Sequence, residues 1–75
     1  SMTNKEVSDR TIIELALWLE LTCDIDENTP VRGFSNIILY SIKKNGTVIY
    51  VTNTSNDVHA WLLGYMKAKE IYQVV

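Results

Sequence analysis

The chain has 75 residues, a hydrophobic content of 47%, one cysteine and a formal net charge of −2. This length fits one domain, placed at residues 3–75, in which a single core gives about 3–5 kcal/mol of stability at best. One cysteine excludes an internal disulfide, and the charge gives no general attraction to nucleic acid or anionic lipid. The cysteine count and the lack of a signal-peptide pattern predict a cytoplasmic protein.

The first predicted element is a helix over residues 3–23. Thr3 and Thr11 each begin a capping box, and Ser8 is a further candidate for the N-cap. We expect the ordered part of the helix to begin at about Ser8, with fraying before it.

The centre of this helix is apolar on more than one side. A first stripe at helical spacing consists of Ile12, Leu15, Ala16, Leu19 and Cys23, and a second consists of Ile13, Leu17 and Leu21. A helix that is apolar on most sides is normally buried on most sides. The segment is too short to span a bilayer, which takes roughly 20 apolar residues. A chain this small has too few other elements to cover both stripes. The apolar surface left uncovered therefore predicts self-association.

Residues 24–35 are predicted to form an acidic loop. Asp24, Asp26 and Asn28 have the spacing of the first three ligands of a calcium loop. The later positions lack the glycine that makes the turn and the bidentate glutamate that completes the site. We therefore favour a solvated loop without a metal over a calcium site.

The most distinct signal is a β-hairpin over residues 37–54, with Asn45-Gly46 at its turn. A type I′ turn needs positive φ at both central residues, which asparagine and glycine accept at low cost. The two-residue loop pairs Lys44 with Thr47. Continued along both strands, this register places Ile38, Tyr40, Ile42, Ile49 and Val51 on the core face. The second face is mixed, includes Leu39, Val48 and Tyr50, and is either partly exposed or covered by another element.

A second helix is predicted after the hairpin, packed on the core face of the sheet. Thr54 or Ser55 caps its start, and Asp57 lies in its first turn near the positive end of the helix dipole. Apolar residues then recur at helical spacing, namely Val58, Trp61, Leu62, Tyr65, Ala68 and Tyr72. Residues 71–75 are compatible with helix, edge strand or tail.

The sequence contains no recognisable catalytic or cofactor-binding pattern. His59 is the only histidine, and the three glycines form no phosphate-binding motif. Glu14 and Glu20 point in different directions on the predicted helix, which does not suit paired acid–base catalysis. We expect a protein that is not an enzyme and that uses no cofactor.

Nucleic-acid binding is the alternative function. Lys43 and Lys44 at the hairpin tip offer phosphate contacts, and Tyr50 nearby offers a ring on which a base can stack. A domain of that kind is normally far more basic. Lysines at a hairpin tip also protect the strands from aggregation, which is the interpretation we favour.

These elements predict an αββα domain of the α+β class, in which the C-terminal helix packs on a two-stranded antiparallel sheet. Because a two-stranded sheet is marginal by itself, we expect a homodimer joined through the first helix, the sheet edges, or both. This outline recurs in many small proteins, including orphan proteins of phages and mobile elements, but shape alone assigns no function.

The predicted function is a non-enzymatic protein-interaction module, a regulator or inhibitor that docks on a larger protein. The predicted contact residues are Ile13, Leu17 and Leu21 on the first helix, with Leu39 and Tyr50 on the hairpin.

Overall fold

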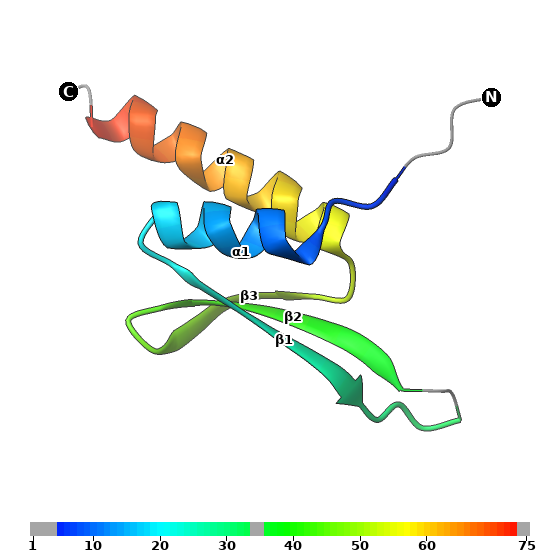
Figure 1. Ribbon diagram of the computed structural model, residues 1–75. Coiled ribbons are helices and arrows are strands. Elements are labelled where there is room, and N and C mark those ends of the chain that lie inside the picture. The colour runs from blue at the N-terminus through cyan, green and yellow to red at the C-terminus, as the bar shows by residue number, and fades with distance from the viewer. Residues whose placement is uncertain (1–4, 34–35, 74–75) are drawn as a thin grey trace.

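The computed structural model describes residues 5–33 and 36–73. Its elements are α1 (Asp9–Trp18), β1 (Thr22–Thr29), β2 (Ile37–Lys44), β3 (Thr47–Thr52) and α2 (Ser55–Gln73). The strands form one antiparallel sheet in the order β1-β2-β3, and both helices lie over the same face of it (Figure 1). The α+β class is confirmed. The two-stranded sheet is wrong, because a third strand makes the order αβββα.

The additional strand is β1, in the segment that was predicted to be a helix end and a loop. Cys23 pairs with Ile42 and Ile25 with Tyr40, which turns these side chains toward the helices. Asp24 and Asp26 alternate with them and are exposed on the other side. The alternation of apolar and acidic residues is the period of a half-buried strand, and it explains why this segment pairs with β2.

Helix α1 ends at Trp18, five residues earlier than predicted, in a Schellman motif. The backbone N–H of Leu21 donates to the carbonyl oxygen of Ala16 at 2.8 Å, and that of Glu20 donates to Leu17 at 3.0 Å. Glu20 takes the left-handed conformation, with φ of 64°. Glycine is the usual residue at this position, and its absence leaves the helix end without its strongest sequence signal.

Replacing Glu20 with glycine should raise the free energy of unfolding by about 0.5–1 kcal/mol. The substitution removes the steric cost of a Cβ at positive φ, offset in part by the greater freedom of glycine in the unfolded chain. Urea denaturation followed by circular dichroism measures the change. Glu20→Ala is the matched control, because it removes the same carboxylate and keeps the Cβ. Equal effects of the two variants would show that charge, and not backbone strain, is responsible.

The hairpin turn is confirmed, but the register beyond it differs from the prediction. Asn45 and Gly46 have φ of 52° and 81°, and Lys44 pairs with Thr47. A β-bulge then makes Ile49 an extra residue, so that Ile42 pairs with Tyr50. The bulge reverses the faces of the rest of β3. Tyr50 therefore packs against the core, whereas Ile49 and Val51, which were predicted to be core residues, are exposed.

The core lies between the two helices and the sheet. Its buried apolar residues are Ile12, Ala16, Leu19, Leu21, Cys23, Tyr40, Ile42, Val58 and Leu62. They include members of the first stripe of α1 and of the stripe of α2, as expected. Ile38, also predicted for the core face, is 40% exposed. Tyr40 is the core residue with a polar contact, since its hydroxyl donates to Asp9 Oδ1 at 2.9 Å.

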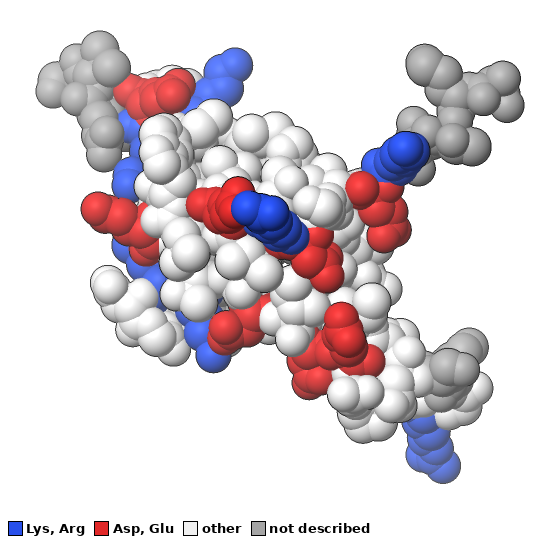
Figure 2. All heavy atoms as spheres, viewed as in Figure 1, with Lys and Arg blue, Asp and Glu red and all other residues white. Residues whose placement is uncertain are grey.

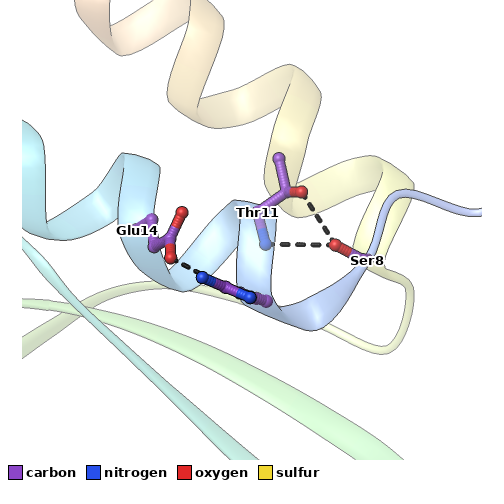
Figure 3. A network of polar contacts seen from close by, with 4 residues as sticks. Ser8, Thr11 and Glu14 are labelled. Atoms are coloured by element: carbon purple, nitrogen blue, oxygen red, sulfur yellow. Dashed lines mark hydrogen bonds and ion pairs between the residues drawn. The ribbon is translucent and has the colours of Figure 1, made fainter.

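Both helices begin with a hydroxyl cap. In α1 the Ser8 hydroxyl accepts a hydrogen bond from the backbone N–H of Thr11 at 3.2 Å, and the two hydroxyls lie 2.7 Å apart (Figure 3). Arg10 and Glu14 form an ion pair one turn apart on the exposed side of the same helix. In α2 the Thr54 hydroxyl accepts from the N–H of Asp57 at 3.2 Å. The expected start of α1 at about Ser8 is therefore confirmed, and of the two candidate caps of α2, Thr54 and Ser55, Thr54 is the one that accepts this hydrogen bond.

Candidate interaction surface

The structure separates the predicted contact residues of the first helix. Leu17 is 61% exposed near the end of α1, and Ile13 is half-buried and packs against the core. Leu21 lies beyond the end of the helix and is 2% exposed. The Schellman motif turns Leu21 under α1, so a partner cannot reach it in this fold.

The predicted contact residues of the hairpin are also separated. Leu39 is half-buried on the open face, by which we mean the side of the sheet turned away from the helices. Tyr50 lies on the helix side because of the bulge, with its ring 5.3 Å from that of Trp61 and nearly parallel to it. Trp61 stacks in the same way on Tyr65, so the Tyr50 ring contributes to packing between β3 and α2.

The largest exposed apolar side chain described is Trp18, which is 73% exposed at the end of α1. It stands next to Leu17, and we call these two residues the α1 surface. The C-terminal ends of α1 and α2 lie at the same end of the molecule (Figure 1). Between them is an open cleft of about 330 Å³, lined by Trp18, Leu19, Glu20, Met66, Lys69 and Glu70. A tryptophan beside a cleft provides an apolar anchor and a recess for a protein partner.

A second exposed apolar group follows β3. Val48 and Val51 are each 48% exposed and Ile49 is 41% exposed, and we call these three residues the β3 ridge. The bulge creates the ridge, because the extra residue lies between the two valines and the pairing of Val51 with Ser41 turns Val51 to the open face. This reversal has no local signal, since no glycine marks the bulge.

The opposite edge of the sheet is acidic. Asp24, Asp26 and Glu27 are exposed on β1, and Figure 2 shows acidic side chains along this strand. The Asp24 carboxylate forms an ion pair with Lys43 Nζ at 2.8 Å. One of the two hairpin-tip lysines is therefore held by an acidic strand and Tyr50 is stacked on Trp61, which weakens the case for nucleic-acid binding.

The polar groups of β1 do not converge on a site. Asp26 accepts a hydrogen bond from the backbone N–H of Asn28 at 2.9 Å, and Asp24 is paired with Lys43. Within residues 5–33 and 36–73, histidine, cysteine and carboxylate side chains form no group of three that could hold a metal ion. Cys23 is buried, as expected, and desolvation followed by the nearby Asp24 and Asp9 charges raises the pKa of its thiol. A buried thiol with a raised pKa is a poor nucleophile.

In the described part of the chain, neither helix combines the length and the apolar character needed to cross a membrane. Comparison with known proteins finds no matching family model, no matching curated protein and no matching solved structure. The fold defines a small α+β domain with two exposed apolar surfaces, the α1 surface and the β3 ridge.

Proposed function

We propose that this chain is a non-enzymatic protein-interaction module of the cytoplasm, a small regulator or inhibitor that works as a homodimer and docks on a larger protein. The observation that carries the proposal is the exposure of Trp18 and Leu17 together on α1. The core does not need either side chain, because Ile12 and Ala16 of α1 and the C-cap residue Leu19 supply the buried contacts of this segment. Exposed tryptophan in an apolar setting is typical of the residues that dominate protein–protein binding energy.

The two surfaces suit two different interactions. The α1 surface projects beside a cleft, a shape that receives a protruding side chain from a larger partner. The β3 ridge lies along an edge of the sheet, where a second strand can add to β3. We therefore assign the larger partner to the α1 surface and the second copy to the sheet.

The experiment begins with capture of binding proteins from the host lysate on the wild-type chain and on Leu17→Glu and Trp18→Glu variants. Both substitutions are at exposed positions and should change the free energy of unfolding by no more than about 0.5 kcal/mol. Removing an anchor of this kind costs about 2 kcal/mol of binding or more, so the captured protein should bind about 30-fold more weakly. Lys67→Glu, an exposed charge change on α2, is the matched control and should keep full binding.

The binding protein is then purified and titrated against a Trp61→Phe variant, in which Trp18 is the remaining tryptophan. Docking through the α1 surface removes Trp18 from water, so its fluorescence should shift to shorter wavelength as the binding protein is added. Binding without a shift, or binding equal in Trp18→Glu and Lys67→Glu, would refute this role of the α1 surface. Sedimentation across a concentration series tests the homodimer separately.

A further inference from the structure

The two edges of the sheet differ sharply in charge. The β1 edge carries Asp24, Asp26 and Glu27, and Pro30 follows directly. Charged side chains and proline are devices that keep an edge strand from pairing with another chain. β3, with the sequence TVIYVT, contains no charged residue and no proline, and within residues 5–33 and 36–73 it pairs in the sheet with β2 alone. The β1 edge is therefore protected by charge and proline, whereas the β3 edge has neither and carries the bulge at Ile49 as its one protective feature.

We propose that β3 pairs antiparallel with β3 of a second copy across a two-fold axis, which joins the two sheets into one. This inference rests on the homodimer of the proposed function and specifies its interface. Pairing of β1 with β1 would bring two acidic strands together, which like-charge repulsion opposes. Pairing of β3 with β1 is head-to-tail and would leave a free edge at each end, and growth into a filament would follow. The two-fold β3 pairing is the arrangement that closes.

The side chains of β3 are complementary to themselves in this arrangement. Antiparallel pairing across an axis near the bulge sets Thr47 opposite Thr52 and Val48 opposite Val51 of the second copy. The Val48–Val51 pair forms twice, and both valines lie on the open face, where they are each half-exposed in the single chain. Cross-strand pairs of β-branched residues stabilise a sheet. The bulge at Ile49 lies at the axis and interrupts the ladder there without changing the pairs on either side.

The charges at the two ends of β3 are complementary as well. Lys44 is exposed and pairs with Thr47 at the start of the strand, whereas Lys43 is already held by Asp24. At the end of the strand, the Thr52 hydroxyl donates to the Asp57 carboxylate at 3.2 Å. Lys44 and Thr52 lie on the helix side of the sheet, because they alternate with Ile42 and pair with Tyr40 respectively. Antiparallel pairing therefore brings Lys44 of each copy toward Asp57 of the other.

The test exchanges the charges of the proposed valine pair. In a Val48→Lys, Val51→Lys double variant, each cross-strand pair places lysine opposite lysine, and the dimer should dissociate at least about tenfold more readily. In a Val48→Glu, Val51→Lys double variant, each pair places glutamate opposite lysine, and the dissociation constant should return to within a few-fold of the wild-type value. Sedimentation velocity measures both, and Lys67→Glu, an exposed charge change on α2, serves as a control that leaves the dimer unchanged.

Restoration by the charge exchange is the supporting result, since the proposed pairing places a glutamate at 48 opposite a lysine at 51 of the other copy. The β3 pairing would be overturned if the lysine double variant dimerised as tightly as the wild type. It would also be overturned if the glutamate–lysine double variant did not regain wild-type dimerisation. In both cases the homodimer itself would stand. A wild-type chain that is monomeric at every concentration would refute the homodimer itself. If the double variants do not fold, hydrogen exchange of wild-type β3 decides, because pairing must protect its amides more at high concentration than at low.

Discussion

Replacing Leu21 with alanine should lower the free energy of unfolding by about 2–5 kcal/mol, which is comparable to the whole stability of a domain of this size. Leu21 is among the most buried apolar residues, and its N–H holds the end of α1 through the Ala16 carbonyl. Loss of the side chain leaves a cavity between the helix end and the start of β1. The same substitution at Leu17, which is exposed, should change the stability by no more than about 0.5 kcal/mol.

Urea denaturation of the two variants, followed by circular dichroism, measures the contrast. The pair is informative because Leu17 and Leu21 are the same residue type at helical spacing and fall on one stripe of the helix expected from the sequence. If the helix continued to Cys23, both would face the same surroundings and the two losses would be alike. Equal losses would therefore contradict the helix end at Trp18.

The elements that could be predicted are those with a local signal. The Asn45-Gly46 turn depends on two residues that accept positive φ, and the caps at Ser8 and Thr54 depend on one hydroxyl each. The α2 stripe is long enough for its period to be unambiguous. In each case the information lies within a few residues, so the chain outside the element does not change the outcome.

Strand β1 could not be predicted as reliably, because its sequence also fits two other structures, a longer first helix and a calcium loop. The apolar run of α1 continues through Leu21 and Cys23 without glycine or proline to end it. The acidic residues that follow also have the spacing of a calcium loop. Alternation of apolar and acidic residues over so short a stretch leads to a strand only when a neighbouring strand is available to pair with it. β2 is that neighbour, through the Cys23–Ile42 and Ile25–Tyr40 pairs.

The candidate surfaces show the same dependence on tertiary structure. Leu17, a predicted contact residue, is exposed, whereas Leu21 of the same predicted stripe is buried. Ile49 and Val51 were predicted to be buried, and the bulge exposes them. Because the side-chain period of a strand is two residues, one inserted residue moves every later side chain to the other face. A single backbone feature thus decides which residues of β3 a partner can reach.

Stability should fall as the pH rises from 10 to 12, and Tyr40 should account for much of the loss. Tyr40 is 4% exposed and its hydroxyl donates to Asp9. Burial first, then the hydrogen bond to Asp9 and the charge of that carboxylate, raises the pKa of Tyr40 from 10.0 to about 12. A pKa that is higher in the folded chain than in the unfolded chain means that the neutral phenol stabilises the fold. That stabilisation is complete below pH 10 and is lost as the pH rises through 12, at a cost of about 2–3 kcal/mol.

The Tyr40→Phe variant separates this titration from other alkaline effects. At pH 8 it should be less stable than the wild type by about 1–3 kcal/mol, because the hydrogen bond to a charged acceptor is lost. Between pH 10 and 12 its stability should fall less than that of the wild type, so the two curves of urea midpoint against pH should converge. A residual slope should remain in the variant, because burial also raises the pKa of the Cys23 thiol above its usual 9.0. Tyr65→Phe, at a half-buried ring without this hydrogen bond, is the control that should keep the full alkaline loss. Parallel curves for wild type and Tyr40→Phe would mean that the Tyr40 phenol is not held neutral by its burial against Asp9.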